Sequence, residues 1–193
     1  MDFKEMMFSG EIYDPNAGDI LNEQRACMEL LYDINHLRPS QVEEQTTQLR
    51  ELLAAYGEGS YIQLPLHANW GAHTYFGKNS YANYNLTLVD DAPIYIGDYV
   101  KIGPNVTLSA GTHPIDPAAR QKQLQYNQSI RIGNNVWLGA HVSVMPGVTI
   151  GDNTVIGSGS VVTHDIPANV VAFGVPCRVH REITDADQVD GWS

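Results

Sequence analysis

The chain has 193 residues, and its 22 acidic side chains outnumber its 11 basic ones, which gives a formal net charge of −11. Hydrophobic residues make up 43% and charged residues 17%, a composition typical of one folded domain, with room for a small cap, and not of a disordered chain. So acidic a protein is repelled by nucleic acid and by anionic membrane surfaces, so neither is an expected partner.

The 2 cysteines, Cys27 and Cys177, lie far apart and outside any pair motif. This number is too small for a disulfide framework or a thiolate metal site. The N-terminal residues include acids where a signal peptide needs a basic start, and no apolar stretch reaches the roughly 20 residues that span a bilayer. We therefore expect a cytoplasmic protein with reduced thiols.

Two helices are predicted near the N-terminus. Residues 22–38 carry apolar side chains at three- and four-residue steps, the period of an amphipathic helix. A second helix is expected to begin at Ser40, because Ser40 and Glu43 have the spacing of a capping box. Gly57 suits the left-handed position just past the end of that helix.

The later part of the chain has a period of six residues. Aliphatic residues recur at this step in two runs, and a small or β-branched residue stands two positions before most of them. The aliphatic positions are Ile96, Ile102 and Leu108, then Ile132, Leu138, Val144, Ile150, Ile156 and Val162. Glycine often follows directly, and pairs such as Asn134-Asn135 suit sharp corners. This period fits neither a helix nor a long strand, and it predicts an all-β solenoid of stacked short strands.

The repeat is interrupted by residues 111–131, which we expect to form an extended loop that His113 opens. An imidazole with a pKa near 6.5 is suited to removing a proton from a hydroxyl at neutral pH. From the residues alone, His113 is either such a base or an ordinary surface histidine.

Several motifs resemble those of the hexapeptide-repeat sugar O-acetyltransferases, of the maltose and galactoside acetyltransferase type. They lie at Tyr81–Asp91, Pro104–Leu108, Gly111–Pro114, Ile132–Gly139 and Gly174–Arg181. The helical N-terminus is similar to the cap of that family. The resemblance implies a left-handed parallel β-helix with three strands per coil and an N-terminal α-helical cap. It divides the chain into a cap at residues 1–58 and a β-helix with its C-terminal tail at residues 59–193.

The resemblance also implies the activity. It indicates an acyltransferase that moves the acetyl group of acetyl-CoA to a hydroxyl of a sugar or glycoside, working as a homotrimer with the coenzyme in a groove between subunits. His113 would act as general base for direct attack on the thioester. No metal and no covalent enzyme intermediate is needed, since neither cysteine lies in a nucleophile motif.

The same resemblance assigns the binding residues. The acceptor would contact Asp14, Asn69, Tyr81, Asn83 and Asp91. Acetyl-CoA would contact Trp137, Gly139, Ala140, Ser158, Thr163, His164, Arg178 and Arg181. Small residues permit close approach of the pantetheine arm, the backbone amide near Ala140 would stabilise the oxyanion, and the two arginines would bind the phosphates. The chain has Asn69 and Ala140 where relatives often have Ser, and His164 where they have Lys. The sequence of its 111–131 loop also differs from that of the relatives, so the resemblance does not identify which sugar is the acceptor.

Alternatives remain open on the residues alone. Asn83 suits a corner turn, Asp91 a solvated loop, Tyr81 the core and the two arginines a basic tail. An acetyltransferase of an antibiotic or amino acid would keep His113 and the donor residues, whereas a nonenzymatic scaffold would need neither. A zinc hydratase of the same fold is disfavoured. Its zinc needs three convergent histidines, two of them five residues apart, and no two of the 7 histidines here have that spacing.

Overall fold

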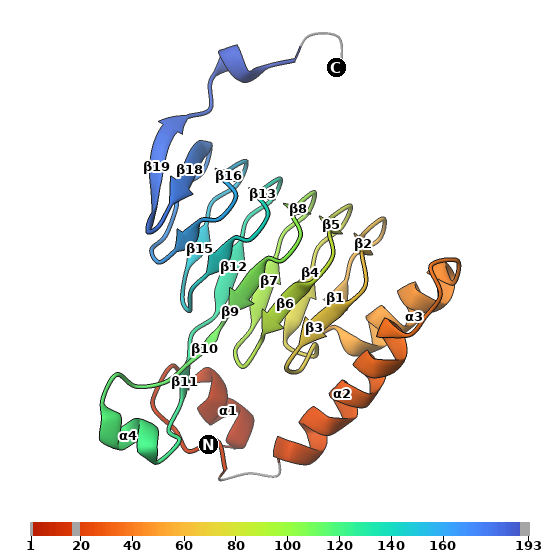
Figure 1. Cartoon of the computed structure of the whole chain (residues 1–193), viewed down its shortest axis with the longest axis vertical. Helices are drawn as coiled ribbons and strands as arrows, with labels where there is room; N and C mark the ends of the chain where they lie inside the picture. The colour runs from red at the N-terminus through yellow and green to blue at the C-terminus, as the bar shows by residue number, and fades with distance from the viewer. Residues whose placement is uncertain (1, 17–19, 190–193) are drawn as a thin grey trace.

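The six-residue repeat forms a left-handed parallel β-helix of about 6 coils (Figure 1). This computed structural model describes residues 2–16 and 20–189. Each complete coil contributes one short strand to each of three sheets, and equivalent strands of successive coils pair in parallel. The predicted fold class is confirmed.

The strands are two to five residues long in the coils, as a repeat of six with a corner requires. The first sheet consists of β1 (Ala55–Tyr56), β4 (Thr74–Phe76), β7 (Ile94–Ile96), β12 (Ile130–Ile132) and β15 (Thr149–Ile150). The second consists of β2 (Tyr61–Ile62), β5 (Tyr81–Ala82), β8 (Lys101–Ile102), β13 (Trp137–Leu138), β16 (Val155–Ile156), β18 (Val170–Gly174) and the antiparallel β19 (Cys177–Glu182). The third consists of β3 (Leu66–Ala68), β6 (Leu86–Val89), β9 (Thr107–Ser109), β14 (Ser143–Val144) and β17 (Val161–Val162).

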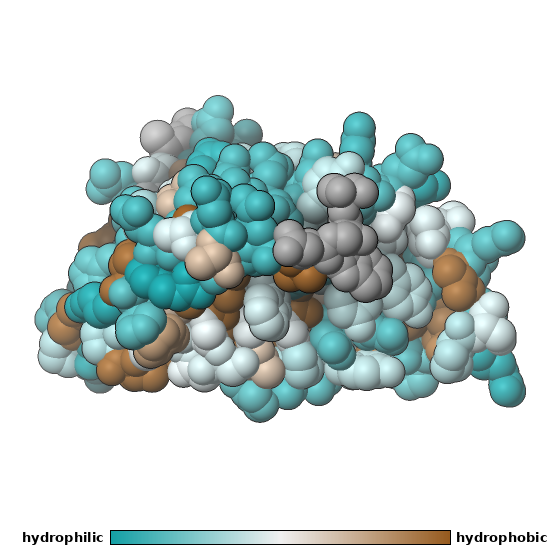
Figure 2. Space-filling model, turned by 90° about the horizontal axis from the view of Figure 1, so that it is seen from above, coloured by the Kyte–Doolittle hydropathy of each residue, from teal (hydrophilic) through white to brown (hydrophobic). Residues whose placement is uncertain are grey.

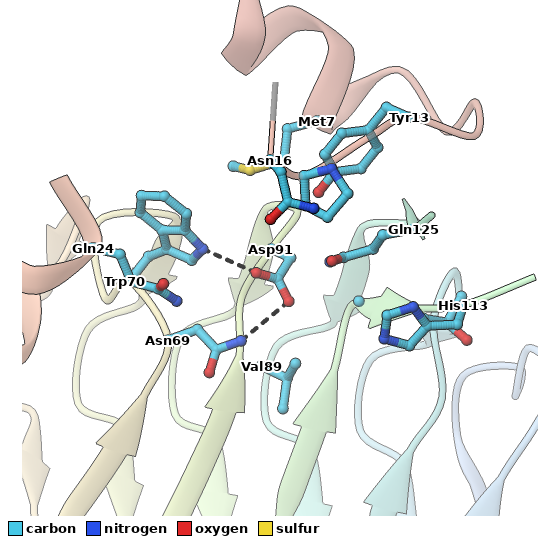
Figure 3. A pocket seen from close by; sticks show the side chains of 13 residues that line it. Met7, Tyr13, Asn16, Gln24, Asn69, Trp70, Val89, Asp91, His113 and Gln125 are labelled. Atoms are coloured by element: carbon cyan, nitrogen blue, oxygen red, sulfur yellow. Dashed lines mark hydrogen bonds between the residues drawn. The ribbon is translucent and has the colours of Figure 1, made fainter. Parts of the chain in front are cut away.

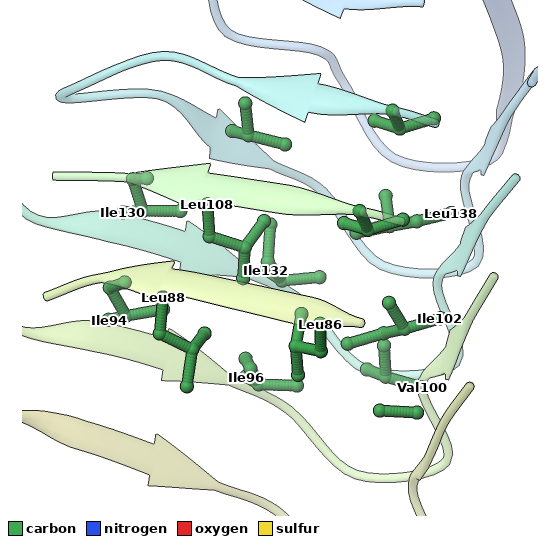
Figure 4. Packing of buried hydrophobic residues seen from close by; sticks show 14 of the residues in the cluster. Leu86, Leu88, Ile94, Ile96, Val100, Ile102, Leu108, Ile130, Ile132 and Leu138 are labelled. Carbon is green, nitrogen blue, oxygen red and sulfur yellow. The ribbon is translucent and has the colours of Figure 1, made fainter. Parts of the chain in front are cut away.

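The interior of the coils is a ladder of aliphatic side chains (Figure 4). All nine aliphatic positions of the repeat are buried, with at most 4% of any residue exposed. The residues two positions earlier also point inward, including the polar Thr154 and Ser160, which are completely buried. Burial of this continuous apolar stack, at roughly 25 cal/mol per Å², is the main stabilising contribution to the solenoid.

The corners depend on two residue types with different functions. Glycine directly after a ladder residue allows neighbouring coils to approach: a Cβ on Gly97 would lie 2.7 Å from the carbonyl carbon of Gly133. The left-handed backbone conformation lies two residues further on and is mostly taken by asparagine, as at Asn135 (φ 55°) and Asn153 (φ 58°). These asparagines also bond from coil to coil, since Asn135 Nδ2 donates to Asn153 Oδ1 at 3.0 Å.

Two helices, α2 (Ile20–Asn35) and α3 (Val42–Leu52), lie at the N-terminal end of the solenoid, whereas α1 (Phe3–Phe8) lies against residues 126–127 of the third coil (Figure 1). Side chains of α2 and α3, among them Ile34 and Leu49, continue the core at the first coil. Asn35 ends α2 and joins it to β3, because its side chain donates to the carbonyl of Leu66 at 2.7 Å and accepts from the amide of Leu66 at 2.9 Å. The predicted end of this helix at residue 38 was therefore three residues too late.

Two sequence predictions for the second helix are wrong. Ser40 lies in the turn before α3, whose N-cap is Gln41 without a side-chain cap, so Ser40 and Glu43 form no capping box. Gly57 follows β1 and does not adopt a left-handed conformation. A Cβ there would lie 2.3 Å from the carbonyl carbon of Gly77, so Gly57 serves the close approach of coils.

The early coils are longer than the later ones, and the difference lies at one corner. Tyr75 pairs with Tyr95 twenty residues later, whereas Arg131 pairs with Thr149 eighteen residues later. Leu88 and Ile96 are successive ladder residues eight positions apart, so the two extra residues lie between the third sheet and the first. We call this corner of each coil the third corner.

The interruption of the repeat is the third corner of the third coil. It forms an antiparallel hairpin of β10 (Gly111–Thr112) and β11 (Tyr126–Asn127), with the short helix α4 (Pro117–Gln121) between them. The sequence predicted only an extended loop here, whereas the structure has a hairpin and a short helix. Tyr13, in the segment after α1, bonds to Gln125 in both directions, at 2.9 and 3.0 Å. This pairing holds the N-terminal segment against the hairpin.

The chain ends its described part with a short 3-10 turn, η1 (Asp185–Asp187), after β19. Viewed from above, the molecular surface is mostly hydrophilic, with hydrophobic side chains in several small groups (Figure 2). Within residues 2–16 and 20–189, no helix combines the length and apolar character needed to cross a membrane.

Candidate active site

A cavity of about 340 Å³ lies where the third corners of the first three coils meet the N-terminal segment (Figure 3). It is lined by Met7, Tyr13, Pro15, Asn16, Gln24, Asn69, Trp70, Val89, Asp91, Gly111, Thr112, His113 and Gln125. The first coil supplies residues 69 and 70, the second supplies 89 and 91, and the third supplies the hairpin. The two-residue extension of the early coils therefore provides part of the cavity wall.

His113 follows β10, and its ring lies across the cavity from Trp70 in Figure 3. Its Nδ1 is 2.9 Å from the carbonyl oxygen of Leu124. A carbonyl oxygen can only accept, so Nδ1 carries the proton and the neutral ring has its lone pair at Nε2. The hairpin thus orients the ring and selects its tautomer, as a general base requires.

Asp91 is the only carboxylate among the described residues that line this cavity. Both of its oxygens accept hydrogen bonds, Oδ1 from Trp70 Nε1 at 2.9 Å and Oδ2 from Asn69 Nδ2 at 3.1 Å (Figure 3). Its main-chain carbonyl accepts from Asn127 Nδ2 at 3.1 Å. Each carboxylate oxygen keeps a further lone pair for a ligand hydroxyl.

The adjacent Asp90 points away from the cavity and is completely buried. It accepts hydrogen bonds from the amide of Trp70 at 2.9 Å and the hydroxyl of Thr74 at 3.2 Å. Burial raises the pKa of Asp90 to about 6, because the charged form has lost its hydration. The two consecutive acids therefore have different environments: Asp91 lines the cavity and Asp90 lies in the protein interior.

The N-terminal segment covers the cavity through Tyr13, Pro15 and Asn16. Burial raises the pKa of Tyr13, whose hydroxyl accepts from the buried Asn127 at 2.9 Å. The predicted acceptor residue Asp14 is exposed beside this wall and does not line the cavity. Its Oδ1 instead accepts from the amide of Asn16 at 2.9 Å, which shapes the turn.

Tyr81 and Asn83 were expected beside His113, and the structure does not place them there. Tyr81 lies on the second sheet and Asn83 directly follows β5, one corner earlier in the coil than Asp91. Resemblance of a motif along the sequence gives no information on which corner of a three-sided coil each residue occupies. Within one chain, only Asn69 and Asp91 of the predicted acceptor residues line the cavity with His113.

The predicted donor residues fall into three groups. Gly139, Ala140 and Ser158 lie at the corner between the second and third sheets, the same corner as Asn83. Coils are close there, since a Cβ on Gly139 would lie 2.6 Å from the amide nitrogen of Ser158. Trp137 and Arg181 are aligned on the second sheet through the paired residues Val155 and Val171, and both line a groove of about 670 Å³.

The third group lies beyond the last coils. His164 and Arg178 line a separate cavity of about 320 Å³, and His164 Nδ1 is 2.8 Å from the hydroxyl oxygen of Thr163. Arg178 and Arg181 therefore line different cavities and do not form one clamp within the chain. A bulge in the pairing of β18 with β19, at Val171 and Ala172, lies between them.

Sequence reasoning missed most of the cavity wall. Trp70, Tyr13, Asn16, Gln24 and Gln125 line it without having been predicted, and Asn127 supports it from behind. The eight-residue step from Leu88 to Ile96 marks the corner that carries the site, and the same step precedes Phe76 at the corner that carries Trp70. Within the described part of the chain, no group of three or more His, Cys, Asp or Glu side chains is placed to hold a metal.

Two family models and several known proteins are similar to this chain. Residues 6–57 match the family model described as the maltose acetyltransferase hexapeptide capping motif, and residues 129–164 match that of the bacterial transferase hexapeptide (six repeats). The chain is 46% identical to the galactoside O-acetyltransferase of Escherichia coli (strain K12), over 97% of this chain and 93% of that protein. It is 49% identical to the galactoside O-acetyltransferase of Lactococcus lactis, over 92% of this chain and 86% of that one.

Two solved structures are similar over nearly their whole length. A galactoside acetyltransferase in complex with coenzyme A superposes with a TM-score of 0.94 at 46% identity, covering 97% of this chain and 94% of that one. A maltose O-acetyltransferase from Clostridium difficile superposes with a TM-score of 0.93 at 39% identity, covering 96% and 99%.

Proposed function

Because the chain belongs to the hexapeptide-repeat sugar O-acetyltransferase family and is an acyltransferase, we propose that it transfers the acetyl group of acetyl-CoA to a hydroxyl of a sugar or glycoside. The observation that carries the proposal is the pair of His113 and Asp91 on one cavity. An imidazole with its lone pair at Nε2 is available as a base, and a carboxylate held by two donors can accept from acceptor hydroxyls.

The reaction follows from these two groups. Asp91 accepts a hydrogen bond from one hydroxyl of the sugar and so orients it. His113 Nε2 removes the proton of another hydroxyl as its oxygen attacks the thioester carbonyl carbon. The new C–O bond gives a tetrahedral oxyanion, and its collapse breaks the C–S bond. The coenzyme thiolate then takes the proton from the imidazolium, which restores the neutral ring.

The second substrate, acetyl-CoA, requires its own set of binding residues. We propose that a neighbouring copy of the chain in a homotrimer supplies them. In one chain, Asn83, Ala140 and Ser158 lie at a different corner from His113. If the corner of one copy that carries these residues faces the third corner of the next, acceptor and donor groups meet in one site. Trp137, 56% exposed on the second sheet, would then line the donor groove together with Arg181.

The proposal also includes a cellular compartment and a division of the chain into two parts. The free thiols Cys27 and Cys177 favour a reducing compartment, and we place the enzyme in the cytoplasm on that basis. We also keep the division into a cap at residues 1–58 and a β-helix at residues 59–193 as a prediction. The core is continuous across it, and β1, before residue 59, already pairs with β4.

The test is a thiol-release assay with acetyl-CoA and a panel of acceptors. The panel contains mono- and disaccharides and their glycosides, with serine and chloramphenicol to represent other acceptor classes. We expect release that depends on a sugar and exceeds the hydrolysis seen without acceptor, with the acetyl ester identified by mass spectrometry. Transfer to serine or chloramphenicol in preference to every sugar would contradict the proposed acceptor class.

A further inference from the structure

Two buried residues beside the cavity have no part in the mechanism above. Trp70 is 5% exposed and comes from the third corner of the first coil, and Asp90 is completely buried at the same corner of the second coil. The indole of Trp70 donates to Asp91 Oδ1, and its amide donates to Asp90. Trp70 thus lies between the two consecutive acids and contacts both.

Asp90 holds the corner that carries Trp70. Its carboxylate accepts from the amide of Trp70 and the hydroxyl of Thr74, and its carbonyl oxygen is 2.8 Å from Nδ1 of His73. The His73 ring packs on the indole with centroids 5.0 Å apart, and burial lowers the pKa of His73. Asp90 therefore holds the backbone of Trp70 directly, and it holds the indole ring through His73.

The burial of Asp90 is costly unless its oxygens are hydrogen-bonded, and both donors to it belong to residues 70–74. A buried carboxylate thus orders one five-residue segment. The ordered segment delivers a single side-chain donor to the cavity carboxylate, the indole N–H at 2.9 Å. With Asn69 as the other donor, the plane of the Asp91 carboxylate is fixed from two sides.

We propose that Trp70 is a positioning residue that fixes the orientation of Asp91 toward the acceptor, and that Asp90 fixes Trp70. The inference rests on the proposed function, because it assigns to Asp91 the role of binding acceptor hydroxyls. A carboxylate with both oxygens already bonded offers one remaining lone pair per oxygen in a set direction. Trp70 therefore determines which hydroxyl orientations of a sugar are accepted, and hence discrimination between epimers.

The kinetic test uses Trp70→Phe, which removes the indole N–H and keeps an aromatic ring against His73. We expect kcat/KM for the sugar to fall about tenfold, the value of one lost hydrogen bond to a charged group, with KM for acetyl-CoA unchanged. The ratio of kcat/KM values for two epimeric glycosides should move closer to one. Tyr56→Phe is the matched control, because it likewise removes a side-chain donor from an aromatic residue, here the bond from the partly buried Tyr56 to Ser60 O at 2.8 Å.

Two further variants separate positioning from stability. In an Asp91→Ala background, Trp70→Phe should cause no additional loss, since there is no carboxylate left to orient. Asp90→Asn keeps an acceptor for the Trp70 amide and should retain most of the parent's kcat/KM, whereas Asp90→Ala should lose as much as Trp70→Phe. Additive losses from Trp70→Phe and Asp91→Ala, or an unchanged epimer preference in Trp70→Phe, would overturn the inference.

A measurement without turnover distinguishes this inference from the proposed function. The indole N–H signal of Trp70 in a ¹⁵N-labelled sample is the one that Trp70→Phe removes. It should shift in Asp91→Ala and stay in place in Tyr56→Phe. If the parent acetylates no acceptor, the proposed function fails while this spectrum still tests the contact. A Trp70 signal unchanged by Asp91→Ala would show that the indole does not hold the carboxylate.

Discussion

Arg181 donates two hydrogen bonds to Asp187, one to each carboxylate oxygen and each 2.7 Å long. This pairing lowers the pKa of Asp187 to about 2 and raises that of Arg181, so both are ionised at neutral pH. Both residues line the groove that also contains Trp137. A coenzyme phosphate that binds Arg181 therefore shares the guanidinium with the Asp187 carboxylate or displaces it.

The donor groove gives the first prediction. Arg178→Ala should raise KM for acetyl-CoA about ten- to a hundredfold with little change in kcat, because a charged ground-state contact is lost. Arg181→Ala should raise it less, since Asp187 already occupies this side chain, and Asp187→Asn should lower KM a few-fold. Initial rates over a range of acetyl-CoA concentrations measure all three. An unchanged KM in both arginine variants would return these residues to a solvated tail.

His113 gives the second prediction. His113→Ala should lower kcat by roughly 10²–10⁴, the usual contribution of a positioned general base, while folding and coenzyme binding persist. His113→Asn separates the roles, because an amide can bond the hydroxyl and cannot take its proton. If His113→Asn kept most of the parent's turnover, the base would have to be a different group.

Asp90 gives a prediction for stability against pH. Its pKa is about 6 in the folded chain and 3.8 ordinarily, so between these values the folded state holds a proton that the unfolded state has lost. The contribution of Asp90 to stability is therefore greatest below about pH 4 and is lost as pH rises to about 6. The free energy of unfolding of Asp90→Asn, taken relative to that of the parent, should therefore increase by about 3 kcal/mol from pH 4 to pH 7. Urea unfolding of both proteins at several pH values tests this, and a pH-independent difference would contradict it.

The two corner residue types give a fourth prediction. A Cβ on Gly77 would lie 2.3 Å from the carbonyl oxygen of Gly97, so Gly77→Ala should destabilise the fold by about 1–3 kcal/mol or more through backbone displacement. Gly159 has φ +73°, and a Cβ there would meet no atom within 4 Å, so Gly159→Asn, the residue of the other corners, should change stability by under about 1 kcal/mol. Thermal unfolding compares the pair. Equal losses would show that glycine serves the same purpose at both positions.

Assembly gives the fifth prediction. Light scattering at micromolar concentration should report about three times the chain mass of 21.3 kDa. Because Asn83 and His113 lie at different corners of one chain, mixing inactive His113→Ala with inactive Asn83→Ala subunits should restore part of the activity after subunit exchange. An active monomer would refute the shared site.

The interior of the solenoid was predictable because the ladder repeats one local pattern many times. The aliphatic positions from Ile96 to Val162 are all buried, since the strands that carry them pair with their equivalents in the neighbouring coils. The helix ends were not predictable from local spacing. Asn35 ends α2 through a bond to Leu66, 31 residues away, and the turn before α3 made the local capping motif at Ser40 irrelevant.

The cavity was partly predictable for a related reason. His113 and Asp91 lie in motifs that can be read along the chain, and both line it. Trp70 has no such motif, and its function depends on stacking residue 70 beneath residues 90 and 91 of the next coil. Asn83 belongs to the same motif as Asp91 and lies at another corner. Sequence proximity and spatial proximity diverge in a coil that turns every six residues.

The bond from Asn127 to the carbonyl of Met7, 120 residues apart, has a consequence for the order of folding. The coils pair residues about 20 positions apart, so they can form one after another as the chain leaves the ribosome. Helix α1 is synthesised first, yet its hydrogen-bonding partner is made only after the third coil. In refolding, we therefore expect the β-sheet circular dichroism signal to recover before enzymatic activity.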